Sequence, residues 1–109
     1  MTQAILLHER KYHTGSDRIV LQYFLLVDQI SFGCNTLDIY GVRASMFCNG
    51  TPCQSRTMRG LTPFSHKVAA ILGCLSDGLV PPEQMGRFVS DMLSREIREK
   101  TGQKTARLL

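Results

Sequence analysis

The sequence predicts a single α+β domain, in which an antiparallel meander of three or four strands is followed by two packed helices. Three observations predict this class. The first half of the chain is rich in β-branched and aromatic residues and is divided by turn signals. The second half contains two stretches whose apolar residues recur with the helical period. Because the two kinds of segment are segregated along the chain, we expect a sheet covered by a helical hairpin.

The first expected strand spans residues 3–12. It begins apolar at Ala4–Leu7 and becomes charged at Glu9–Lys11. The composition of His13–Asp17 is that of a turn, which ends the strand.

The second expected strand, residues 18–32, is the most apolar stretch of the chain. Leu21 and Tyr23 would point to one face of a sheet, while Val20 and Phe24 would point to the other. Apolar residues on both faces are typical of a central strand with helices on one side and partial cover on the other. A buried helix is the competing interpretation, but the β-branched and aromatic residues favour a strand.

A third strand is expected at residues 36–48, after a turn at Gly33–Asn35. The Asn49-Gly50 pair then signals a tight turn. Residues 54–61 are polar and weakly patterned, so they are a candidate fourth strand at the edge of the sheet. Arg56 and Arg59 would suit an edge, because charge blocks further strand pairing.

The first helix is expected at residues 63–76, with Thr62 as N-cap, Pro63 at the first helical position and Gly78 as a left-handed cap. Cys74 lies near its apolar stripe, so we expect that thiol to be packed. The stripe consists of Phe64, Val68, Ile71, Leu72 and Leu75.

The second helix is expected at residues 82–100. Its apolar stripe consists of Met85, Phe88, Val89, Met92, Leu93 and Ile97. The expected domain therefore spans residues 1–101, and residues 102–109 are expected to form a flexible basic tail.

The charge is distributed unevenly over the 109 residues, whose formal net charge is +4. Residues 1–50 are balanced, whereas residues 51–109 carry nine basic and five acidic side chains. A basic face can bind phosphates or an acidic protein surface, although a solvated helix face is the competing interpretation. The candidate basic interaction residues are Arg56, Arg59, Arg87, Arg95, Arg98, Lys100, Lys104 and Arg107.

The sequence contains none of the common catalytic or nucleotide-binding motifs, so we expect a protein that is not an enzyme. Cys48 and Cys53 enclose the Asn49-Gly50 turn, and their sulfurs could face each other across a hairpin, which makes them a candidate redox pair. A zinc site would need a second close pair of ligands, which the spacing of the cysteines and histidines does not supply. We therefore expect neither a metal nor another cofactor.

The N-terminal residues lack the basic region of a signal peptide, and no apolar run reaches the roughly 18 residues that span a membrane. A cytoplasmic location with reduced thiols is therefore expected, and a membrane is not an expected partner.

Several stretches resemble a family of short clostridial-type bacterial proteins known only as a domain of unknown function. The resemblance covers roughly residues 18–97. It implies a fold and a bacterial or mobile-element setting, but no site residues. The stretches that carry it are Tyr23-Phe-Leu-Leu-Val, Asp38-Ile-Tyr-Gly-Val, Lys67-Val-Ala-Ala-Ile-Leu, Val80-Pro-Pro-Glu-Gln-Met and Phe88-Val-Ser-Asp-Met-Leu.

These observations favour a small regulatory or protein-interaction module that binds a larger protein or nucleoprotein, or forms a homodimer. One variant of this hypothesis is an inhibitor of a host defence nuclease, of the anti-CRISPR type, encoded by a phage or mobile element. The other alternative is a nucleic-acid-associated protein that uses the basic C-terminal half.

Overall fold

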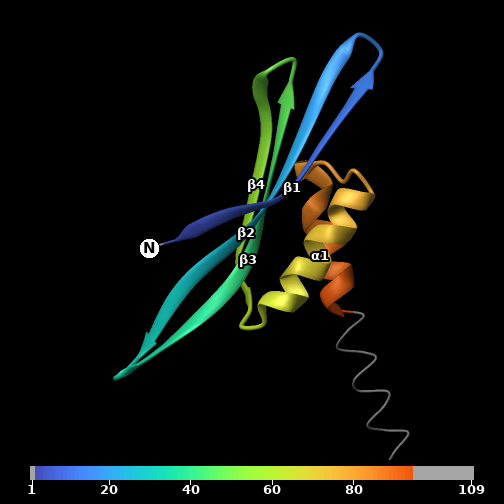
Figure 1. The fold of residues 1–109 in the computed structure, drawn as a ribbon. Coiled ribbons are helices and arrows are strands. Elements are labelled where there is room, and N and C mark those ends of the chain that lie inside the picture. The colour runs from blue at the N-terminus through green and yellow to red at the C-terminus, as the bar shows by residue number, and fades with distance from the viewer. Residues whose placement is uncertain (1, 95–109) are drawn as a thin grey trace, which may run out of the picture.

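The computed structural model describes residues 2–94 and contains one four-stranded antiparallel sheet followed by two helices (Figure 1). The strands are β1 (Gln3–Thr14), β2 (Asp17–Phe32), β3 (Asn35–Cys48) and β4 (Thr51–Thr62), and they lie in the order β1-β2-β3-β4. They are followed by α1 (Ser65–Asp77) and by a second helix at residues 82–94. The predicted α+β meander is confirmed. The expected helix end near Lys100 and the tail at 102–109 lie outside the described residues.

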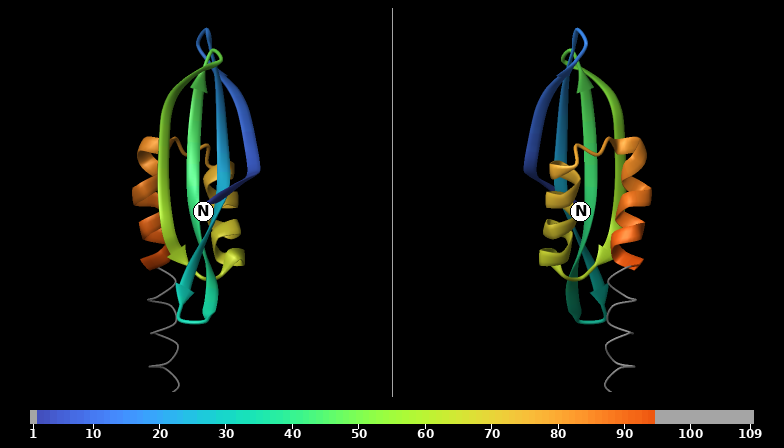
Figure 2. Two further views of the ribbon diagram at one scale, coloured as in Figure 1. Left: turned by 90° about the vertical axis from the view of Figure 1, so that its left-hand side faces the viewer. Right: turned by 90° about the vertical axis from the view of Figure 1, so that its right-hand side faces the viewer.

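The core lies between the centre of the sheet and the two helices, which cover the same face of the sheet (Figure 2). Leu21 and Tyr23 of β2 are fully buried there, as the alternation of the sequence predicted. The helices contribute the apolar stripes that their periodicity predicted, and the buried members of those stripes are Val68, Ile71, Leu72, Leu75, Met85 and Val89.

One buried hydrogen bond ties the sheet to the connection between the helices. The Tyr23 hydroxyl donates to the Val80 carbonyl oxygen at 2.7 Å, and the tyrosine side chain has no exposed surface. Burial raises the pKa of Tyr23 to about 12. This hydrogen bond therefore helps to position the start of the second helix over the middle of the sheet.

The opposite face of the sheet, called the open face below, is turned away from both helices (Figure 2). Val20 and Phe24 of β2 point to it and are only partly buried. Their partners across the strand pair are Phe47 and Arg43 of β3, which point to the same side. This arrangement of one covered and one partly covered face agrees with the apolar residues predicted on both faces of the central strand.

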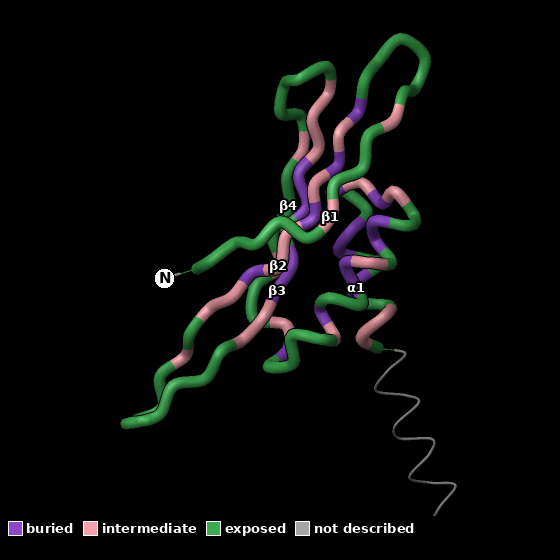
Figure 3. Tube along the Cα trace, in the orientation of Figure 1, coloured by how far each residue is buried: buried purple, intermediate pink, exposed green. Residues whose placement is uncertain are grey.

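Both ends of the sheet extend beyond the helices, and burial falls toward each end (Figures 1 and 3). At one end, Asn49 and Gly50 have φ values of 53° and 82°, as the predicted tight turn requires. The Asn49 side chain also joins the two neighbouring hairpin turns. Its Oδ1 accepts the Arg18 N–H at 2.9 Å, and its Nδ2 donates to Asp17 at 3.0 Å.

The start of α1 differs from the sequence prediction. Thr62 and Pro63 are not its cap and first helical residue, because β4 continues to Thr62 and the helix begins at Ser65. Phe64 is the N-cap, and no side chain caps the helix. Instead, the Thr62 hydroxyl oxygen accepts the Phe64 N–H at 3.2 Å, which shapes the turn between strand and helix.

Four further positions differ from expectation. Gly78 ends α1 with φ of −87°, and the left-handed conformation is adopted by Leu79, at φ of 50°. Cys74 is exposed rather than packed. Phe64 and Phe88, which were predicted as members of the apolar stripes, are 50 and 36% exposed. Phe64 precedes the first residue of α1, Ser65.

Candidate functional site

The basic residues predicted as one interaction face are distributed over several surfaces. Arg56 points toward the helix side of the sheet, where its guanidinium lies against Gly86 of the second helix. Arg59 reaches across the other side of β3 to β2, and Arg87 is exposed on the second helix. The remaining predicted members lie outside the described residues: Arg95, Arg98, Lys100, Lys104 and Arg107.

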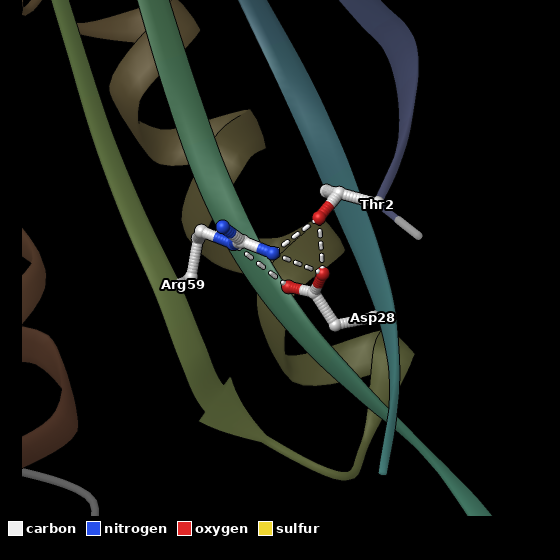
Figure 4. Close-up of polar contacts among 3 residues, drawn as sticks. All are labelled: Thr2, Asp28 and Arg59. Atoms are coloured by element: carbon white, nitrogen blue, oxygen red, sulfur yellow. Dashed lines mark hydrogen bonds and ion pairs between the residues drawn. The ribbon is translucent and has the colours of Figure 1, made fainter.

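Arg59 takes part in a polar cluster that links β2, β4 and Thr2, the residue before β1 (Figure 4). Its guanidinium donates to both carboxylate oxygens of Asp28, at 2.7 and 3.2 Å. Thr2 is hydrogen-bonded to both partners. The bonds from Arg59 and Thr2 lower the pKa of Asp28 to about 2. Arg59 is therefore engaged within the protein rather than free for a ligand.

A cleft of about 380 Å³ lies between β4 and the start of the second helix. It is lined by Gln54 and Arg56 on the strand side and by Pro82 and Glu83 on the helix side. The Gln54 Oε1 atom is buried and has no hydrogen-bond partner among residues 2–94. Arg56 likewise has no ion pair within that part of the chain.

The two thiols predicted as a pair do lie together. Cys48 is partly buried and hydrogen-bonded to Cys53, and this bond together with burial raises the pKa of Cys48. Cys53 is exposed, and its Sγ atom also donates to the Met46 carbonyl oxygen at 3.5 Å. Both are free thiols. No group of three potential metal ligands occurs within the described ranges.

The first half of β1 carries an exposed apolar surface whose residues are not among the predicted site residues. β1 is an edge strand, since it pairs only with β2. Ile5, Leu6 and Leu7 are 37, 46 and 39% exposed. The pairing shifts at Leu7, so this residue forms a bulge. The apolar run in this first strand could be recognised in the sequence. The position of the strand at an edge of the sheet could not, because it depends on the strand order.

Neither of the helices found in residues 2–94 has the length and apolar character of a membrane span. Comparisons of the chain with family models, with curated proteins and with solved structures found no match.

Proposed function

We propose that this protein is a non-enzymatic interaction module that binds an extended segment of a larger protein along the free edge of β1. The observation that supports this proposal is the exposed apolar run Ile5–Leu7 on that edge. An edge strand presents unpaired backbone N–H and C=O groups, which pair readily with another extended chain.

The two edges of the sheet differ in how they are protected. β4 contains Pro52, which lacks a backbone donor, and the arginines Arg56 and Arg59. It also bulges at Gly60, where φ is 66°, and such features disfavour an added strand. The edge of β1 has charges only in its second half, at Glu9–Lys11. The bulge of β1 lies at Leu7, so strand addition is favoured along residues 3–6, before that bulge.

The exposed side chains of β1 indicate which residue types the partner segment would contain. Successive residues of a strand point to opposite faces, so an added strand next to Ile5 and Leu6 would meet an apolar side chain on each face. Cross-strand pairs of aromatic or β-branched residues stabilise such contacts. The proposed partner is thus an extended segment with apolar residues at neighbouring positions, and main-chain hydrogen bonds supply the remaining affinity.

The test uses a matched pair of substitutions. Leu7 and Leu37 are 39 and 43% exposed, but Leu7 lies on the edge strand β1, whereas Leu37 lies on β3 in the β2–β3 hairpin and does not pair with β1. Proteins captured from a bacterial lysate by the wild-type protein should be lost with Leu7→Lys and retained with Leu37→Lys. Equal retention or equal loss with both variants would contradict the proposal.

Light scattering separates the proposed partner from a second copy of the chain. The protein alone should have the mass of a monomer, 12.2 kDa. A concentration-dependent dimer that Leu7→Lys dissociates would show that the edge serves self-association instead.

A further inference from the structure

The open face combines aromatic and basic side chains in the centre of the sheet. Phe24 of β2 lies opposite Arg43 of β3, and Val20 lies opposite Phe47. The Arg43 guanidinium carbon is 5.7 Å from the centroid of the Phe24 ring, a cation–π contact. Phe24 and Phe47 are both half-buried, so each ring is anchored in the sheet and keeps part of its surface accessible.

The acidic groups on the open face are already engaged there. The Glu9 carboxylate accepts a hydrogen bond from Gln22 at 2.8 Å and lies 3.5 Å from the Lys11 ammonium. Asp28 is held by Arg59. By contrast, Arg18 and Arg43 have no ion pair among residues 2–94. The free charge of this face is therefore positive and would attract phosphate groups.

A cleft of about 540 Å³ continues the same surface toward the hairpin turns. Its lining includes Lys11, His13 and Arg18, together with Val20, Gly50 and two residues that point to the helix side, Tyr12 and Ile19. The register places the first three on the open face together with Val20. Val20 is the cross-strand neighbour of Phe47, so the basic cleft and the aromatic positions form one surface.

The spacing of the aromatic residues suits an extended polymer rather than a single small molecule. Phe24 and Val20 are four residues apart on β2, which corresponds to roughly 13 Å along the strand, and Phe47 lies beside Val20. Two stacking positions at this separation can engage separate bases of one strand. Bases stacked inside a duplex are not available to such rings.

Hydroxyl groups border the aromatic positions on the β4 side. The register places Ser55 beside Ser45 and Thr57 beside Arg43, and both β4 residues are exposed. A side-chain hydroxyl can donate to and accept from the ribose 2′-hydroxyl, the group that distinguishes RNA from DNA.

We propose that the open face binds single-stranded RNA, with Phe24 and Phe47 stacking on bases and Arg43 and Arg18 contacting phosphates. This site uses the face of the sheet rather than the backbone edge of β1, although Leu6 of that edge is the cross-strand neighbour of Phe24. The proposal does not depend on the function proposed above. It also differs from the basic C-terminal half predicted from the sequence.

The test measures the fluorescence anisotropy of a labelled oligouridylate of about a dozen nucleotides, at salt concentrations from about 50 to 200 mM. The full-length protein should bind oligouridylate more tightly than oligodeoxyuridylate of the same length, and it should bind a duplex weakly. No binding at the lowest salt, or equal binding of the three probes, would overturn the proposal.

Two kinds of substitution separate stacking from charge. Phe24→Leu should weaken binding roughly tenfold without changing the salt dependence, because it removes a stacking surface. Arg43→Met should weaken binding and lower the slope of log affinity against log salt by about 0.7, as expected for one phosphate contact.

Arg87→Met is the matched control, since it removes the same charge from an exposed site on the second helix. It should leave both affinity and slope unchanged. Equal effects of Arg43→Met and Arg87→Met would show binding by diffuse charge and overturn the assigned site. Thermal unfolding of each variant confirms that the protein is folded in these measurements.

Discussion

The Met58 carbonyl oxygen would lie only 2.3 Å from a Cβ atom placed on Gly41, so the backbone of β4 occupies the space of that side chain. This close approach arises because residues 59–61 of β4 lie opposite Gly41 alone, between the pairs Tyr40–Thr62 and Val42–Met58. A backbone atom in a paired strand cannot move away by a change of rotamer, as the end of a side chain can. Gly41→Ala should therefore lower the free energy of unfolding by about 1–3 kcal/mol, as measured by urea denaturation.

Gly86→Ala is the contrasting variant. A Cβ atom there would lie 2.5 Å from an Nη atom of Arg56, but this is the end of a long side chain and can move. Alanine is also favoured over glycine inside a helix by about 1 kcal/mol. Unfolding should show unchanged or increased stability. A loss as large as that of Gly41→Ala would mean that Arg56 is fixed against the helix.

Tyr23→Phe should destabilise the protein by about 1–3 kcal/mol, because the buried Val80 carbonyl loses its donor at 2.7 Å. Tyr12→Phe is the control, since the Tyr12 hydroxyl has no hydrogen bond within the described part of the chain. Urea denaturation of both variants at neutral pH provides the measurement. Similar losses in the two variants would show that the Tyr23 hydroxyl contributes no more to stability than a hydroxyl without a hydrogen bond.

Because the pKa of Tyr23 is raised in the folded protein, we expect the free energy of unfolding to depend on pH in the alkaline range. The folded protein holds the Tyr23 proton up to a pKa of about 12, compared with an ordinary value of 10.0. Because the unfolded chain loses this proton first, stability is fully present below about pH 10 and falls as the pH rises toward 12. The difference in unfolding free energy between wild type and Tyr23→Phe should therefore shrink over this range.

Because the pKa of Asp28 is lowered in the folded protein, we expect the free energy of unfolding to decrease in acid. Its pKa is about 2 in the folded protein, compared with an ordinary value of 3.8, because Arg59 and Thr2 donate to the ionised carboxylate. The stability that this cluster contributes is present above about pH 4 and is lost as the pH falls toward 2. Asp28→Asn should flatten the acid limb of a stability curve. Asp38→Asn, at an exposed position outside the cluster, should leave that limb as in wild type.

Cys48 should react with iodoacetamide more slowly than Cys34, since it is partly buried and its raised pKa leaves less thiolate. Peptide mass spectrometry after limited labelling at mildly alkaline pH measures both rates. Cys53→Ala removes the hydrogen-bond partner and should accelerate labelling of Cys48. Unchanged labelling would show that burial alone protects this thiol.

Segments of the fold could be predicted where their apolar residues repeat with a clear period. Both helical stripes and the strand around Tyr23 were predictable, because their buried residues repeat with the period of the element. β4 was weakly predicted, since it is an edge strand with few buried side chains. Its extension to Thr62 also explains why the helix start predicted at Thr62-Pro63 is wrong. A pattern in the local sequence does not show how far a neighbouring strand extends.

The candidate sites were less predictable, because their residues meet through pairing across strands. The proximity of Cys48 and Cys53 could be predicted from the turn between them. The neighbours of Phe24 could not, since Arg43 approaches it only through the register of β2 and β3. Likewise, Arg56 and Arg59 are close in the sequence but reach opposite sides of the sheet.

The sheet extends beyond the helix layer at both ends, and this shape has a consequence for local unfolding. Amide groups of β2 near Leu21 and Tyr23 lie beneath the helices, so their hydrogens should exchange with solvent only when the whole domain unfolds. Amides near Phe32 and Leu37 lie in an exposed hairpin and should exchange through local opening. A single strand would thus span the most and the least protected parts of the protein.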